Sequence, residues 1–341
     1  MANRSSNYLV VVLLLCIVRI SNGRNGDADP TYRDCLIQCE QTGCVEQHCF
    51  STCKPSSVQT AAINGNLTDL YLKWKQSCCR ADCRYYCIQR IENDRRVNGH
   101  PPIKYHSKWP VKRLFGLEEP ASVAFCAMNL CIHLFRWLSF RSLVNHGLPM
   151  KQKKRPFYEF ATLWQLYGLL NVTMWIFSTM SHTRDVEITK RVKFCCSIAA
   201  IGYSLAIAII RSFGVRNEAA RVMVLAPLLA FSTTHILFLN NYEFNYEWNH
   251  KVCTAMEISE LLIWALWSIL GRHPARRKVW AMVAGSSIAM VLEAQDFPPY
   301  DGIFDGHSLS LAAAVPVSYI RWSFILEDAK FLTSIFVKKT K

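Results

Sequence analysis

The stretch ASVAFCAMNLCIHLFRWLSF (121–140) decides the fold, because it is about as long as a membrane-spanning helix and carries a single charged residue, Arg136. It is followed at once by Arg141. Six more apolar segments follow it along the chain, at 157–178, 194–211, 222–239, 255–271, 279–294 and 307–326. The pattern predicts an all-α polytopic membrane protein built as a seven-transmembrane helix bundle.

The positive charge of the chain lies mainly between these apolar segments. The 341 residues are 51% hydrophobic and carry a formal net charge of +14. Basic residues gather at 141–155, 211–221 and 272–278, which are alternate loops and so fall on one side of the membrane. The positive-inside rule makes that side cytosolic, with the N-terminal region lumenal and the C-terminus cytosolic. This distribution favours topogenic loop charge over nucleic-acid binding.

The first segment of the chain has the pattern of a signal peptide (1–23). Arg4 precedes an apolar core at 9–18, which is too short to span a membrane comfortably. An uncleaved anchor is the alternative. We therefore expect a lumenal domain at 24–118, the bundle at 119–328 and a cytosolic tail at 329–341. Asn66 begins an Asn-Leu-Thr glycosylation acceptor, which agrees with a lumenal domain.

The predicted lumenal domain is dense in cysteine, which in an oxidising compartment indicates a disulfide framework. The spacing of Cys35 and Cys39, and of Cys83 and Cys87, places each pair on one helical face, so two helices could be joined side by side. Paired zinc-type motifs are missing here, which disfavours a metal knuckle. We predict disulfides at Cys35, Cys39, Cys44, Cys79, Cys83 and Cys87, and leave open their connectivity and the roles of Cys49, Cys53 and Cys78.

Polar residues converge at one end of the predicted bundle. Ser178 and His182 close the second apolar segment with i,i+4 spacing, while Asp305 and His307 open the seventh, and both ends face the lumen in the predicted topology. Histidine within membrane segments is rare and usually functional. Two facing helices could aim Ser178, His182 and His307 at a zinc ion, with Asp305 beside them in a catalytic role. The alternatives are interfacial histidines and an Asp305 that caps its helix.

Several uncommon strings in this chain resemble those of one family in the same order. They are Tyr32-Arg33-Asp34-Cys35 with Cys39 and Cys44, the group Cys79, Cys83 and Cys87, Lys108-Trp109-Pro110, Glu119-Pro120-Ala121-Ser122, Ser178 with His182-Thr183-Arg184-Asp185, Asp296-Phe297-Pro298-Pro299, Asp305 with His307, and Glu327-Asp328. The chain resembles the post-GPI attachment to proteins factor 3 family, within the CREST superfamily of membrane hydrolases. The match covers nearly the whole mature chain.

The resemblance implies lipid remodelling of GPI-anchored proteins, by phospholipase A2-like removal of the sn-2 acyl chain. It implies a zinc centre at Ser178, His182 and His307, and as partners GPI-anchored proteins, their lipid and the membrane, without nucleic acid. The family's last motif has a second histidine where this chain has Leu311, and acidic residues stand where this chain has Lys190 and Lys193. Loss of a ligand weakens zinc strongly, since even outer partners of a metal site contribute about 10–100-fold.

Three functions follow from these observations. The first is a zinc-dependent hydrolase of GPI lipid, the second a catalytically degenerate relative that binds GPI lipid or protein, and the third a seven-span receptor with a cysteine-rich ectodomain. The C-terminal Lys338-Lys339-Thr340-Lys341 is similar to a dilysine retrieval signal. We therefore expect a multi-pass membrane glycoprotein of the endoplasmic reticulum and Golgi.

Overall fold

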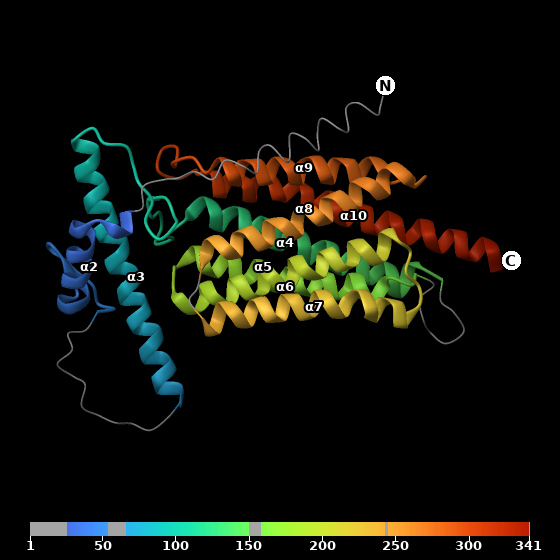
Figure 1. Cartoon of the computed structure of the whole chain (residues 1–341), viewed down its shortest axis with the longest axis horizontal. Coiled ribbons are helices and arrows are strands. Elements are labelled where there is room, and N and C mark those ends of the chain that lie inside the picture. The colour runs from blue at the N-terminus through green and yellow to red at the C-terminus, as the bar shows by residue number, and fades with distance from the viewer. Residues whose placement is uncertain (1–25, 54–65, 150–157, 243–244, 341) are drawn as a thin grey trace.

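The computed structural model describes residues 26–53, 66–149, 158–242 and 245–340 (Figure 1). The predicted signal peptide (1–23) and the last residue of the predicted retrieval signal lie outside them. The described chain forms a small N-terminal domain that stands at one end of a bundle of long helices (Figure 1). We refer to the end of the bundle that carries this domain as the domain end, and to the opposite end as the far end.

The N-terminal domain is built on two helices, α2 (Pro30–Thr42) and the long helix α3 (Asn66–Val97), that pack against each other (Figure 1). Helix α2 begins where the Asp29 side chain accepts a hydrogen bond from the Thr31 backbone, and ends at Gly43, whose φ of 74° suits glycine. The other elements are η1 (Gly26–Ala28) and the hairpin strands β1 (Cys44–Val45) and β2 (His48–Cys49).

Disulfides hold this domain together. The four bridges are Cys35–Cys87, Cys39–Cys83, Cys44–Cys49 and Cys53–Cys79. All six cysteines that the sequence indicated lie in them, and the i,i+4 pairs join α2 to α3. Cys49 and Cys53 are the partners that the sequence left open, whereas Cys78 keeps a free, buried thiol. Cys39, Cys83 and Cys87 pack with Tyr32 and Tyr105 in the small core.

Seven helices of the described chain form the bundle, joined at one corner by the short helix η3 (Leu143–Gly147). The seven are α4 (Pro120–Ser142), α5 (Ala161–Thr183), α6 (Glu187–Ser212), α7 (Glu218–Asn241), α8 (Tyr246–Leu270), α9 (Arg276–Gln295) and α10 (Gly306–Thr340). Packing contacts close a ring in the order α4, α5, α6, α8, α9, α10 and back to α4, and α7 packs on α6 outside that ring. The ring brings the start of α10 beside α4, close to the end of α5.

Five of the seven bundle helices are long and apolar enough to cross a membrane, namely α4, α6, α7, α8 and α10. The remaining two, α5 and α9, are less apolar along their length. Helix α5 is rich in aromatic, amide and hydroxyl side chains, and α9 begins with Arg276, Arg277 and Lys278. The described residues thus establish a mostly helical, multi-pass membrane protein with a disulfide-rich N-terminal region.

Ion pairs fasten the N-terminal domain onto the bundle. Asp82 of α3 accepts hydrogen bonds from Arg113 at 2.9 Å and from Arg184, next to the end of α5, at 2.7 Å. Asp296, at the end of α9, pairs with Lys104 and accepts a hydrogen bond from the Trp109 indole at 2.9 Å. The connection between the two parts therefore lies directly over the ends of α5 and α9.

A buried ion pair joins helices at the far end of the bundle. Arg211 of α6 donates to the Asp328 carboxylate of α10, with Nε 2.9 Å from Oδ2. The Tyr158 hydroxyl, before α5, donates to the same carboxylate at 2.6 Å. Asp328 is fully buried and the Arg211 side chain is 8% exposed. The buried carboxylate thus has both a charged partner and a further hydrogen bond, as a buried charge requires.

Candidate functional site

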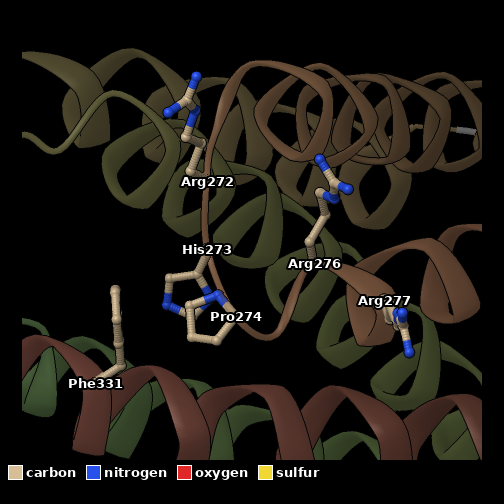
Figure 2. A pocket seen from close by; sticks show the side chains of 6 residues that line it. All are labelled: Arg272, His273, Pro274, Arg276, Arg277 and Phe331. Carbon is tan, nitrogen blue, oxygen red and sulfur yellow. The ribbon is translucent and has the colours of Figure 1, made fainter.

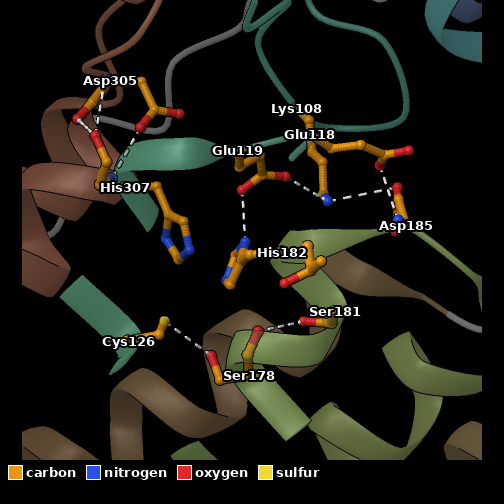
Figure 3. A network of polar contacts seen from close by, with 12 residues as sticks. Lys108, Glu118, Glu119, Cys126, Ser178, Ser181, His182, Asp185, Asp305 and His307 are labelled. Atoms are coloured by element: carbon orange, nitrogen blue, oxygen red, sulfur yellow. Dashed lines mark hydrogen bonds and ion pairs between the residues drawn. The ribbon is translucent and has the colours of Figure 1, made fainter. Parts of the chain in front are cut away.

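Two histidines from different helices meet at the domain end of the bundle (Figure 3). His182 lies in the last turn of α5 and His307 in the first turn of α10. Their ring centroids are 5.2 Å apart. Ser178 lies one turn before His182 on the same helical face, as the i,i+4 spacing requires. The structure therefore brings together Ser178, His182 and His307, although 129 residues separate Ser178 from His307 in the sequence.

Both rings are oriented by carboxylates. His182 Nδ1 lies 2.6 Å from Glu119 Oε2, and its Nε2 lies 3.0 Å from the ammonium nitrogen of Lys193. A proton on Nδ1 satisfies both contacts, because Nδ1 then donates to the carboxylate while Nε2 accepts from the ammonium. His307 Nδ1 lies 2.9 and 3.0 Å from the two oxygens of Glu293. The His182 side chain is 1% exposed and that of His307 33%, so His307 is the ring that a ligand can reach.

Glu119 connects His182 to a chain of charges (Figure 3). The Lys108 ammonium donates to Glu119 at 2.8 Å and lies 3.4 Å from Asp185. Burial opposes ionisation of Glu119, but Lys108 and His182 outweigh it and hold the pKa of this carboxyl well below its usual range. Burial likewise opposes ionisation of Asp185, and Lys108 with Lys190 nevertheless lowers its pKa. Both carboxylates are therefore ionised at neutral pH.

The other two predicted site residues have local partners. Ser178 Oγ lies 3.3 Å from Cys126 Sγ of α4, in a buried contact. Asp305 accepts a hydrogen bond from the Ser308 backbone at 2.8 Å, and its own backbone N–H donates to the Ser308 hydroxyl at 2.9 Å. Asp305 is thus the cap of α10 and positions His307 by fixing the start of that helix.

The residues of this site do not fit a zinc ion. Zinc takes the lone pair of a neutral imidazole, and both ring nitrogens of His182 already face Glu119 and the Lys193 ammonium. Leu311, one turn after His307, has no donor atom in its side chain. Among the described residues, no group of three or more His, Cys, Asp or Glu ligand atoms within 4.8 Å includes either histidine. An ammonium therefore stands where a metal would bind His182.

The ligand group that does satisfy this distance comprises Cys53, Cys79 and Cys83. Cys53 is bonded to Cys79, and Cys83 to Cys39. A cysteine binds metal as a thiolate, which a disulfide sulfur cannot provide. This cluster is therefore a crossing point of two disulfides and not a metal centre.

A cavity of about 440 Å³ lies at the far end of the bundle, lined by Arg272, His273, Pro274, Arg276, Arg277 and Phe331 (Figure 2). The three guanidinium groups point in different directions and do not converge (Figure 2). Phe331 is 24 residues along α10 from His307, about 36 Å on a helix. This cavity is separate from the histidine site.

Sequence reasoning missed several residues of the site. Glu293 stands inside a predicted apolar segment, and an acidic residue there was a signal of function. Lys193 was noted only as a departure from the family, because it lies on α6 and reaches the His182 ring only through the packing of α6 against α5. Lys108 was quoted only within a family motif, and Cys126 gave no signal, because the roles of both depend on how the helices pack.

Fold and site together define a helical membrane protein whose paired histidines lie beneath a disulfide-rich domain. The Per1-like family model matches residues 69–329, and the chain belongs to that family. This confirms the family resemblance that the sequence motifs indicated.

Curated relatives cover the chain almost end to end. The GPI-specific phospholipase A2-like PGAP3 of Danio rerio is 29% identical over 316 residues, 92% of each chain. The human protein of that name is 27% identical over 326 residues, 94% of each chain. The Post-GPI attachment to proteins factor 3 of Drosophila melanogaster is 26% identical over 327 residues, 95% of each. No solved structure matches the chain.

Proposed function

We propose that this protein remodels the lipid of GPI-anchored proteins in the secretory pathway, by phospholipase A2-like removal of the sn-2 acyl chain. The observation that carries the proposal is the pair formed by His307 and Glu293 beside His182, at the end of a membrane helix bundle. In the topology proposed below, an ester near the lipid head group would lie at this depth. The names of the relatives support GPI lipid as the substrate.

The proposal includes a topology. All seven bundle helices span the membrane, the N-terminal domain (24–118) is lumenal, and the tail (329–341) is cytosolic. The basic loops at the far end support this orientation through the positive-inside rule. The protein then resides in the endoplasmic reticulum and Golgi, with the histidine site facing the compartment through which GPI-anchored proteins pass.

The side chains of this site support hydrolysis by general base catalysis. Glu293 holds the proton on Nδ1 of His307, which leaves Nε2 free to take a proton from water. The hydroxide formed attacks the ester carbonyl, and the Lys193 ammonium stabilises the oxyanion. The bond to the glycerol oxygen then breaks, and the proton on His307 passes to that oxygen. The products are a free fatty acid and a lyso-lipid, which balances ester plus water.

The test is rescue of GPI remodelling in cells that lack the family enzyme. We expect His307→Ala to abolish removal of the sn-2 chain, measured by mass spectrometry of anchors released from a reporter protein. The matched control is His146→Ala, because His146 is an exposed histidine in η3 at the far end of the bundle. A His307→Ala variant that remodels as well as wild type would overturn the proposal.

A second candidate function is binding of GPI lipid or protein without hydrolysis. Lys193 on His182 and Leu311 at the place of a further ligand favour it. The two functions separate in one assay, since purified protein given GPI lipid either releases fatty acid or retains the intact lipid. Release by wild type and not by His307→Ala supports the hydrolase.

A further inference from the structure

A cavity of about 90 Å³ lies between the N-terminal domain and the bundle. Its walls come from α3, from the connection that precedes α4, and from the turn between α5 and α6. They include Arg84, Gln89, Lys108, Trp109, Glu119 and Asp185. Because Glu119 lines the cavity and also contacts His182, the cavity begins where the histidine site ends.

Arg84 is the unusual residue of this cavity. Its Nε atom is buried and has no hydrogen-bond partner, and within the described part of the chain no ion pair is formed by its guanidinium. Lys108 in the wall and Arg113 behind it each contact two carboxylates. Lys108 lies between Glu119 and Asp185, and Arg113 bridges Asp82 and Glu118.

Arg80 provides the contrast, one turn earlier on α3. It pairs with Glu40 at 2.8 Å and its side chain is 52% exposed. An exposed, paired arginine is ordinary surface chemistry. A buried arginine atom without a partner is costly unless something fills the place of that partner. Arg84 therefore points to an anionic ligand that the cavity receives.

We propose that this cavity binds the phosphodiester of a lipid head group, with Arg84 as its main ligand. A phosphodiester carries one negative charge, which can pair with the Arg84 guanidinium because no carboxylate of the described residues forms an ion pair with it. Arginine recognises phosphate oxygens through paired N–H donors. A volume of about 90 Å³ accommodates a phosphate group, whereas a protein segment requires far more.

The position of the cavity gives the binding a purpose, which rests on the proposed function. A head group held by Arg84 lies above Glu119, so the glycerol of the same lipid is directed toward His182 and His307. Trp109 and Tyr85 of the same wall offer apolar ring surface beside the polar groups, the mixture typical of ligand sites. The cavity would then select lipids with a phosphodiester and place their esters at the histidines.

The test is binding to the purified full-length protein with its disulfides intact. The probes are dioctanoyl phosphatidylinositol, dioctanoylglycerol, which lacks the phosphodiester, and inorganic phosphate. We expect Arg84→Gln to weaken the phosphatidylinositol at least about tenfold, the loss typical of one charged hydrogen bond. Arg80→Gln is the matched control and should bind as wild type does, while Arg84→Lys should be intermediate.

Each outcome decides the proposal. Equal affinity of wild type and Arg84→Gln, or equal binding of dioctanoylglycerol, overturns it. Inorganic phosphate that binds as tightly as the lipid and displaces it assigns the cavity to free phosphate and overturns the lipid head group. Non-reducing gels of each variant check the fold.

The proposed function is tested separately. Because His307→Ala should bind the probe normally, a loss of remodelling with retained binding supports both proposals. Arg84-dependent binding together with remodelling by His307→Ala would leave the cavity standing and remove the hydrolase. Binding that does not depend on Arg84, together with remodelling that requires His307, would remove the cavity proposal and leave the hydrolase standing.

Discussion

Replacing Asp328 by asparagine should destabilise the protein strongly, because it leaves a buried charge unmatched. Asp328 is fully buried, and Arg211, 8% exposed, donates to it. Removing one partner of such a pair costs about 3–5 kcal/mol. At roughly 2 °C per kcal/mol for a chain of this size, the thermal midpoint should fall by about 6–10 °C.

The preceding residue supplies the control. Glu327 pairs with Lys278, but the side chains are 37% and 39% exposed. Glu327→Gln should therefore cost less than about 1 kcal/mol. The assay is thermal unfolding followed by tryptophan fluorescence, with all variants in the same detergent. The double change Arg211→Met with Asp328→Leu should recover part of the loss, since it removes both charges together. Asp328→Asn and Glu327→Gln midpoints within about 2 °C of each other would refute the reasoning.

Three further outcomes follow from the site and the domain. Leu311→His combined with Lys193→Asp should raise zinc bound per purified protein well above wild type, measured by metal analysis; stoichiometric zinc already in wild type would contradict the poor fit described above. Glu119 has a lowered pKa, so its stabilising contribution is complete above its unfolded pKa of about 4.5 and is lost as pH falls through the folded value. Glu119→Gln should therefore be less stable than wild type at pH 7, and its stability should fall less on acidification. Parallel pH–stability curves of the two proteins would exclude a stabilising role of the Glu119 carboxylate. Cys44→Ala with Cys49→Ala, which opens a bridge of sequence separation 5, should cost about 2 kcal/mol in denaturant unfolding, and an unfolded domain would show that the bridge does more than close a short loop.

The helices of the bundle could be located from the sequence because each must bury an apolar surface in lipid or against a neighbour. The predicted segment 121–140 lies within α4 (Pro120–Ser142), and 255–271 overlaps α8 (Tyr246–Leu270). Boundaries were less accurate where polar residues extend a helix. Helix α10 continues to Thr340, beyond the predicted end at 326. Its last turns contain charged residues, which ended the predicted apolar segment, but no proline or glycine that would end the helix.

The site could be predicted only in part, since it depends on packing between segments far apart in the chain. Periodicity placed Ser178 and His182 on one face, and topology placed His307 at the same end. Nothing local to Glu119 or Lys193 indicates that both contact one imidazole. In the same way, two i,i+4 cysteine pairs indicated that two helices are joined, while Cys53, the partner of Cys79, lies outside any helix or strand and has no such spacing.

The disulfides of α3 have a consequence for when the protein becomes competent. Asp82 lies between Cys79 and Cys83, whose bridges fix this part of α3. Asp82 in turn holds Arg184, two residues after His182. In a chain whose thiols are still reduced, these bridges do not hold Asp82 in place, so we expect its contact with Arg184 to be weaker. With the N-terminal domain in the lumen, as proposed above, oxidation of these thiols would be a maturation step for the site.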